Sequence, residues 1–409
     1  MLVLRLLRQP VPLALWLGQL FSVTGDKLYG MAVLWLVLQL TGSAKLMAAV
    51  SAAESACYVL AGLFGSGLIA RSRRLPMMIR LDLLSAVVIA LVPVSYLLGV
   101  RSVLLLIVVA TAASLVAALF DPALQAALPE VVPAADLQPI VALTDSTDRL
   151  ARVLGPGSAG LLLLVLPEIH LFTLDAATFL ASAAALAFAA RRRASAPPGA
   201  GGRGAPRGAV LDGLREVLRR RSLRVGLAVR GSCNLAWPAF TIGVPFELVH
   251  RLHTGLGSHG LLLGVFGLGN LAGNLLSGNP RTGRHLLAIY CLAWSLVGTG
   301  FLGLALAPSL AVAALATTWM GIFTPLANVS MDAHIAAVVQ PDRLQRVYAL
   351  QRSVVAGASA VGGFAVAAGI EALSGTAVIA AAGTWMLLAG TLSAVRVHRP
   401  AGRSERARV

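Results

Sequence analysis

The chain consists mostly of long apolar runs separated by short polar segments. Each run has about 20 residues, enough for a helix to cross a hydrocarbon core about 30 Å thick. The runs are continuous and rich in Leu, Ala and Gly, whereas a membrane β-barrel would show strict alternation over about ten positions. The pattern therefore predicts an all-α polytopic membrane protein. The twelve predicted spans are Val11–Leu40, Leu46–Ala70, Met77–Val100, Val103–Ala123, Leu143–Leu166, Leu171–Ala190, Val225–Val249, Gly260–Ser277, Leu286–Ala307, Ala311–Ala327, Val354–Ala372 and Ala377–Val395.

Composition agrees with this interpretation. Hydrophobic residues make up 57% of the chain and charged residues 12%, with a mean hydropathy of +0.82. Polar surface on this scale does not cover a soluble protein, so lipid must solvate the remainder. The first run is too long for a signal peptide and contains Asp26 and Lys27. We therefore expect it to be retained as a span.

The basic residues predict the orientation, because Lys and Arg near a span prefer the cytoplasmic side. With the N-terminus inside, Lys45, Arg101 and Arg251 fall outside, Lys27 lies within the first span, and all the other basic residues face the cytoplasm. Twelve crossings return the C-terminus to the cytoplasm. This topology also explains the net charge of +16 without a nucleic-acid partner, since no binding motif accompanies the charge.

One long interruption divides the chain into two halves of six spans. We predict an N-terminal bundle (1–190), a cytoplasmic linker (191–223), a C-terminal bundle (224–397) and a basic tail (398–409). Pro and Gly residues make the first part of the linker flexible. An apolar stripe opposite arginines predicts an amphipathic helix on the inner membrane surface after it; its apolar members are Val210, Leu211, Leu214, Val217 and Leu218.

A faint repeat relates the two halves at an offset of 210 residues. Arg71 and Arg74 follow span two, and Arg281 and Arg284 follow span eight. With equal span counts and a central linker, the repeat favours two related bundles around an axis along the membrane normal. That is the architecture of a rocker-type transporter.

Several short stretches resemble exporters of the major facilitator superfamily, in particular the branch of the enterobactin exporter and related drug:H⁺ antiporters. The stretches are Trp16–Gln19, Gly25–Tyr29, Trp35–Ser43, Phe120–Ala123, Leu128–Pro129, Leu154–Pro156, Leu174–Ala176, Phe179–Leu180 and Arg221–Leu223. The likeness covers the N-terminal half and continues more loosely through the C-terminal half. It implies two six-helix halves with cytoplasmic termini and export of a drug, siderophore or related metabolite.

The superfamily motif after span two departs from its pattern. Gly65, Arg71 and Arg74 match, but Ala70 stands where the family has an aspartate that helps to latch the inner gate. The resemblance implies an altered latch. Alternatively, the two arginines only anchor the loop.

A second motif, of the antiporter type, is represented on span five by Gly155, Pro156 and Gly160, with Ala151 and Ala159 in place of two glycines. Small residues at a spacing of four let helices approach closely, and proline bends a helix. The resemblance favours proton-coupled export. The alternative is an ordinary kinked, close-packed span.

Charged groups inside spans are costly and are usually functional or paired. Asp26 lies near Gln19 and Tyr29 on a polar stripe of span one, where burial would favour proton uptake. It is our first candidate for proton coupling, with a structural hydrogen-bonding role as the alternative. Glu54 on span two has a cavity-facing or interhelical position.

On span seven, Arg230 and Asn234 are candidates for binding an anionic substrate or a buried acid, unless Arg230 snorkels to the interface. Another group of charges lies at the inner ends of spans four and five and predicts an inner-gate salt-bridge network or a solvated loop face. Its members are Asp121, Asp145, Asp148, Arg149 and Arg152.

Other classes of protein lack their signatures here. No Ser/His/Asp constellation and no P-loop is present, and Cys57, Cys233 and Cys291 are too far apart in sequence for a metal motif. We expect a monomeric, cofactor-free secondary transporter in the bacterial inner membrane that exports an amphipathic organic molecule by proton antiport. The alternatives are uptake by the same fold and a non-transporting membrane sensor or assembly partner.

Overall fold

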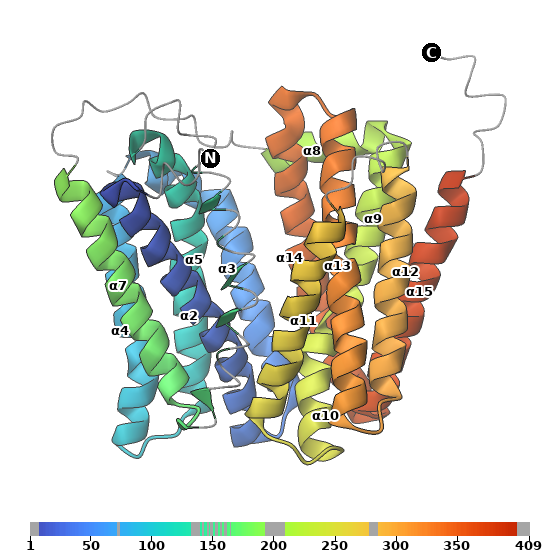
Figure 1. The fold of residues 1–409 in the computed structure, drawn as a ribbon, viewed down its shortest axis with the longest axis horizontal. Coiled ribbons are helices and arrows are strands. Elements are labelled where there is room, and N and C mark those ends of the chain that lie inside the picture. Colours follow the sequence, from blue (N-terminus) through green and yellow to red (C-terminus); the bar gives the residue numbers. More distant parts are fainter. Residues whose placement is uncertain are drawn as a thin grey trace. The chain divides into compact units, whose positions relative to one another are not determined.

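The computed structural model describes most of the chain (Figure 1). The described residues are 8–71, 74–131, 140, 143–144, 147, 150–151, 154–155, 158, 162–163, 165–192, 209–277 and 285–398. Within helices the side chains at 62–71, 121–122 and 209–212, among others, lie outside the description. All the regular elements of the described part are helices, which form two compact units: residues 1–207 with 248–264, and residues 208–247 with 265–409. The predicted domain boundaries stay a prediction.

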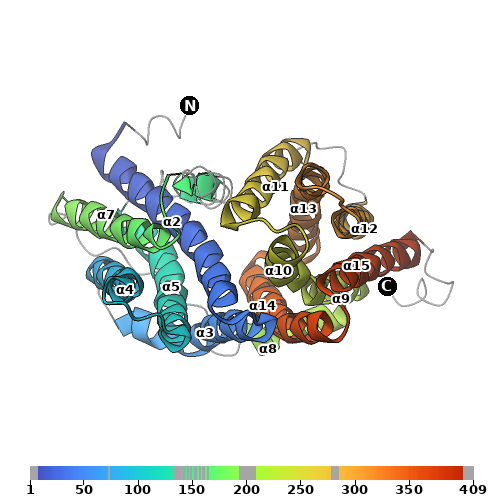
Figure 2. The same cartoon turned by 90° about the horizontal axis from the view of Figure 1, so that it is seen from below.

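Unit 1 contains α2 (Pro10–Thr41), α3 (Ala44–Arg71), α4 (Arg74–Leu97), α5 (Val103–Val131) and α7 (His170–Arg192). Helix α2 packs along α7, α4 packs on both α7 and α5, and α3 packs on α5 (Figure 2). Proline begins α2, where its missing N–H costs nothing. Gly42 ends the helix with a φ of 63°, the left-handed conformation that glycine adopts without strain.

Glycines bring α2 and α7 close together. A Cβ atom at Gly18 would lie 2.9 Å from the Ala185 Cβ, and one at Gly25 would collide with the side chains of Asp175 and Thr178. Close backbone approach through small residues is the usual basis of helix packing in membranes. It also presses a polar face of α7 onto the middle of α2.

Unit 2 contains α8 (Ala209–Arg219), α9 (Arg221–Ala236), η2 (Ala239–Gly243), α12 (Leu286–Ala305), α13 (Leu310–Val338), α14 (Pro341–Ala372) and α15 (Gly375–His398). Helices α10 (Val244–His250) and α11 (Leu256–Ser277) are divided between the units. Helix α12 packs on α13 and α15, and α14 packs on α8 and α9. Gly362 permits the last contact, because a Cβ there would overlap the Leu235 backbone.

The predicted seventh span is not one regular helix. Helix α9 is followed by the π-helix η2 and then by α10. Pro238, at the N-cap of η2, lacks the N–H that a continuous α-helix would use. π-Helical turns inside α-helices often lie at functional sites, so this irregularity marks span seven.

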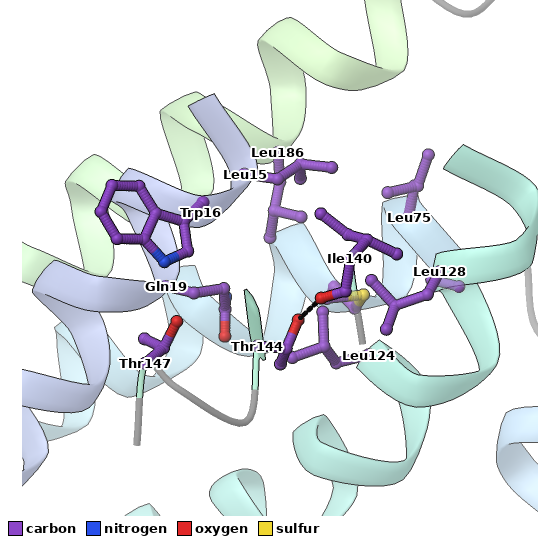
Figure 3. A pocket seen from close by; sticks show the side chains of 12 residues that line it. Leu15, Trp16, Gln19, Leu75, Leu124, Leu128, Ile140, Thr144, Thr147 and Leu186 are labelled. Carbon is purple, nitrogen blue, oxygen red and sulfur yellow. Dashed lines mark hydrogen bonds between the residues drawn. The ribbon is translucent and has the colours of Figure 1, made fainter. Parts of the chain in front are cut away.

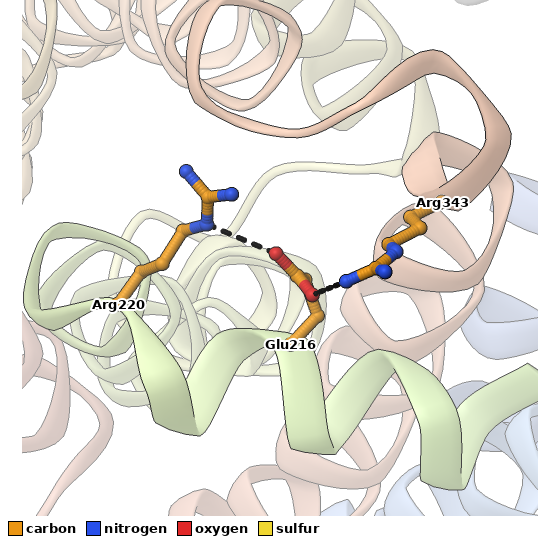
Figure 4. A network of polar contacts seen from close by, with 3 residues as sticks. All are labelled: Glu216, Arg220 and Arg343. Carbon is orange, nitrogen blue, oxygen red and sulfur yellow. Dashed lines mark hydrogen bonds and ion pairs between the residues drawn. The ribbon is translucent and has the colours of Figure 1, made fainter.

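Helix α8 is attached to α14 by an ion-pair network (Figure 4). The Glu216 carboxylate accepts hydrogen bonds from Arg220 Nε at 2.9 Å and from Arg343 Nη1 at 2.8 Å. The two arginines hold the pKa of Glu216 below its usual range. Unlike the predicted stripe, the face buried here includes Glu216 and Val217, while Leu214 and Leu218 are exposed.

The described residues include nine helices that are long and apolar enough to cross a membrane. They correspond to predicted spans one, three, four, six and eight to twelve. Many large apolar side chains lie on the outside of the structure, Leu97 and Leu275 being 86% and 85% exposed. Such extensive apolar exposure fits a lipid-facing surface.

Candidate functional site

A polar stripe runs along one face of α2, as predicted. Gln19, Ser22 and Tyr29 are buried and Asp26 is partly exposed. The spacings of three, four and three residues keep all four side chains on one helical face. The Gln19 amide lies 3.5 Å from the Ser182 hydroxyl on α7.

The middle of this stripe meets a buried carboxylate on α7. Asp175 is fully buried, and the Thr178 hydroxyl lies 3.4 Å from its Oδ1 atom. Its Oδ2 atom is buried without a hydrogen-bond partner in the described part of the chain. The absent side chain of Gly25 leaves room for the Asp175 carboxylate against α2. Asp175 and Asp26 thus lie within electrostatic reach of each other.

Asp82 on α4 was not among the predicted site residues. Its side chain is 1% exposed, and neither carboxylate oxygen has a hydrogen-bond partner in the described part. Ser182 lies close to it, and Asp26 is within electrostatic reach. The sequence carries one signal for Asp82: an acid placed well inside an apolar run, on the same helical face as Met78 and Ser85.

Glu54 extends the group toward α3. It is partly buried, and its charge, like those of Asp26 and Asp175, is within reach of Tyr29. The Tyr29 hydroxyl is buried without a partner in the described part, while its ring contacts Phe172 edge to face at 5.6 Å. The structure therefore brings together four of the predicted residues, Gln19, Asp26, Tyr29 and Glu54, and adds Asp82 and Asp175. We call Asp26, Glu54, Asp82 and Asp175 the carboxylate group.

The carboxylate group has the chemistry of a proton site. Carboxylates buried in apolar surroundings without partners are costly as anions and cheap as neutral acids. Among the described residues, no three His, Cys, Asp or Glu side chains are arranged to hold a metal ion. Proton uptake and release is the reaction that these residues can perform where they stand.

A small cavity lies at the N-terminal end of the stripe (Figure 3). Apolar side chains from α2, α4, α5 and α7 line it, together with the polar side chains of Gln19, Thr144 and Thr147. Its space for water centres is about 20 Å³, which is room for a single water molecule. The cavity is too small for an organic substrate.

Gly155, from the predicted antiporter-type motif, faces α2 beside Asp26. A Cβ atom at Gly155 would lie 2.5 Å from the Lys27 Cβ and 3.2 Å from the Thr24 carbonyl oxygen. The close approach that small residues permit is therefore present at this position. Pro156 and Gly160 lie outside the described residues.

The predicted inner gate lies mostly outside the description. Asp145, Asp148, Arg149 and Arg152 are not among the described residues. Arg71, Arg74 and Asp121 lie on helices, with side chains outside the description. The gate stays a prediction.

Arg230 and Asn234 lie in unit 2, apart from the carboxylate group in chain and unit. Arg230 Nη1 donates to Asn328 Oδ1 at 2.7 Å, and Asn234 Nδ2 donates to the Arg230 carbonyl at 2.8 Å. The Arg230 Nε atom is buried without a partner in the described part. The guanidinium is thus held on α13 and keeps one unused donor.

Solved structures match nearly the whole chain. The human organic anion transporter MFSD10 (TETRAN) is 17% identical, with a TM-score of 0.61, over 94% of this chain and 99% of that one. A bacterial homolog of the human lysosomal transporter Spinster, inward-facing and occupied, is 14% identical, with a TM-score of 0.65, over 95% and 94%. These similarities establish the fold. The chain has the fold of an all-helical polytopic membrane transporter with 12 helices, which confirms the fold predicted from the apolar runs.

The sequence family follows from a separate comparison. The family model described as "Transmembrane secretion effector" matches residues 3–408. The chain therefore belongs to this family of the major facilitator superfamily. It is a multi-pass secondary transporter with a small-molecule substrate, and not an enzyme. No curated protein matches the chain, and the predicted resemblance to the enterobactin exporter branch stays a prediction.

Proposed function

We propose that this transporter exports a small amphipathic organic molecule by proton antiport through alternating access. The carboxylate group in unit 1 carries the proposal, above all Asp82 and Asp175, whose buried oxygens lack partners beside Asp26. The family description, a secretion effector, supports the outward direction. The buried acids supply a chemical basis for coupling to protons.

In the proposed cycle, Asp26 takes up a proton when the protein is open to the outside. Neutral acids cost little in the apolar bundle, so protonation favours the closed and inward-open forms. The proton leaves on the cytoplasmic side, and the anion that remains favours binding of a cationic or polar substrate. Substrate and proton therefore cross in opposite directions.

The substrate surface proposed in unit 2 combines aromatic rings with one cation. Trp237, beside the π-helix, is partly exposed and contacts the rings of Phe240, Phe266, Trp294 and Phe301 at centroid distances of 5.7 to 6.4 Å. Aromatic faces suit the apolar part of a ligand. The free donor of Arg230 suits its acidic or phenolic oxygens. A drug, siderophore or related metabolite has both features.

We place the protein in the bacterial cytoplasmic membrane as a monomer, with both termini in the cytoplasm. Few lysines and many arginines, alanines and glycines are typical of a GC-rich bacterial source, and the distribution of basic residues supports the orientation. The predicted charges of the inner gate, from Arg71 to Arg152, would then close the cytoplasmic mouth. The absence of an aspartate at Ala70 makes this gate differ from the superfamily pattern.

Efflux from cells tests the proposal. Cells expressing the wild type, Asp26→Asn or Glu371→Gln are loaded with a panel of dyes, antibiotics and siderophores, with and without a protonophore. Glu371 is an exposed carboxylate of unit 2 and serves as the matched control. We expect the wild type and Glu371→Gln to extrude at least one compound, and Asp26→Asn or the protonophore to abolish extrusion.

Other outcomes point to the alternatives. Extrusion that persists in Asp26→Asn but stops with the protonophore would move coupling to another acid of the carboxylate group. Accumulation above the level of empty cells would indicate uptake. A lack of movement for every compound would favour a non-transporting sensor.

A further inference from the structure

Asp82 occupies an unusual position between the cavity and the middle of the bundle. Met78, one turn before it on α4, lines the cavity, and Leu186, one turn after Ser182 on α7, lines it as well. Asp82 and Ser182 are therefore one helical turn deeper than the cavity wall. Asp26 lies about two turns deeper than Gln19, which is also part of the wall. Asp82 thus stands between cavity and carboxylate in height.

Polar atoms continue along this height in a column otherwise filled by apolar residues. The Gln19 amide reaches toward the Ser182 hydroxyl, Ser182 lies close to Asp82, and the charge of Asp26 acts on Asp82. Ser22, buried between Gln19 and Asp26 on α2, supplies a further hydroxyl at the same level. Side chains of this kind exchange hydrogen bonds and, through hydroxyls and acids, protons.

The cavity supplies the other end of the column. A water in it would have the Gln19 amide and the hydroxyls of Thr144 and Thr147 as partners, the two to four that a buried water requires. Each of these threonines already donates its hydroxyl proton to a carbonyl one turn earlier. Their oxygens therefore remain available as acceptors for that water.

The ionisable groups around Asp82 add no described compensating cation. Asp26 on α2 and Asp175 on α7 are both acids, and Arg80, on α4 itself, is exposed. The side chain of Asp121 on α5 lies outside the description. An anion at Asp82 is therefore costly among the described groups, and a transient one is easily neutralised by a proton.

We propose that Asp82 is the proton-transfer residue that connects Asp26 with the cavity at the N-terminal end of α2. The transfer has two steps. The O–H bond of the Asp26 acid breaks as an O–H bond forms on the Asp82 carboxylate. The Asp82 acid then gives the proton to water in the cavity, while Gln19 and Ser182 hold the hydrogen-bonded column in position. This inference rests on the proposed proton coupling and adds its release route.

Infrared difference spectroscopy tests Asp82 without a transport substrate. The purified protein in lipid is titrated from acid to alkaline pH while the carbonyl stretch of protonated carboxylic acids is recorded. We expect Asp82→Asn to remove one titrating acid from the wild-type signal and to shift the signal that remains. Ser85→Ala, buried on the same face of α4, is the matched control and should leave the spectrum unchanged. Identical spectra for the wild type and Asp82→Asn would overturn the proposal.

Transport in everted vesicles separates the route from the site. The probe is whichever dye the cells extrude; in Asp82→Asn we expect its accumulation driven by a pH gradient to fall at least about tenfold, because proton transfer by a positioned acid contributes about 10² or more. Downhill exchange of the same dye should stay within about twofold, and Asp82→Glu should restore part of the driven uptake. Full driven accumulation in Asp82→Asn would exclude the relay.

The two proposals fail in different ways. If no dye moves in wild-type vesicles, the proposed function fails, while the infrared titration still decides whether Asp82 exchanges protons. If dyes move and Asp26→Asn abolishes coupling but Asp82→Asn does not, the relay fails and the proposed function stands.

Discussion

The two units treat buried charge in opposite ways. In unit 1, Asp82 and Asp175 are buried with carboxylate oxygens that have no partner in the described part of the chain. In unit 2, buried Glu216 has two arginine partners, and Glu247 accepts a hydrogen bond from Thr376 at 2.6 Å. Partnered charges hold a structure in one state, whereas unpartnered acids change charge easily. The difference suggests that unit 1 exchanges protons and that unit 2 keeps its ionised groups fixed.

Close packing in unit 2 should give the largest effect on stability. Gly362→Ala places a Cβ atom on the Leu235 backbone, which cannot move away as a side chain can. We expect a loss of about 1–3 kcal/mol, measured as a lower midpoint of thermal unfolding for the purified protein. Gly357→Ala, on the same helix with no atom within 4 Å, should leave the midpoint unchanged or raise it. Equal effects of the two variants would contradict the packing shown here.

Neutralising a partnered charge in unit 2 should come next. Glu216→Gln leaves Arg220 and Arg343 with weaker acceptors, because hydrogen bonds to charged groups contribute about 1.5–3 kcal/mol before solvent screening of the half-exposed arginines. We therefore expect a loss of about 1 kcal/mol in thermal unfolding. Glu371→Gln is the control. An unchanged midpoint in Glu216→Gln would show that α8 is held to α14 by apolar contacts alone.

The same ion pairs predict a dependence on pH. The arginines lower the pKa of Glu216, so its stabilising effect is complete above the unfolded value of about 4.3 and is lost as the pH falls through the lower, folded pKa. The difference in midpoint between the wild type and Glu216→Gln should therefore be largest near neutral pH and disappear in strong acid. A difference that grows as the pH falls would contradict this sign.

Neutralising an unpartnered acid in unit 1 should have the smallest effect on stability. Asp175→Asn keeps the shape of the side chain and removes the cost of burying an anion, so the midpoint should stay within about 1 kcal/mol of the wild type or rise. Proton-driven transport should nevertheless be impaired. A large loss of stability would mean that Asp175 has the structural role that unit 2 gives to Glu216.

Periodicity and composition were sufficient for most of the fold. Nine described helices coincide with predicted spans because the membrane requires long apolar helices whatever their packing. The break in span seven at Pro238 was missed, since proline inside a span is also tolerated in kinked helices. The candidate site was predicted in part: Asp26, Gln19 and Tyr29 share one helical stripe, which spacing alone reveals.

The amino-acid sequence by itself determined the class of protein, its spans, its expected orientation and the polar stripe of α2, because these depend on local hydrophobicity and helical period. Only the tertiary structure decided which distant residues meet. Gly25 and Gly18 draw α7 onto α2, and this contact places Asp175 and Ser182 beside the stripe. Packing of α4 on α7 adds Asp82. Such contacts depend on the fit between helix surfaces, which no single helix specifies.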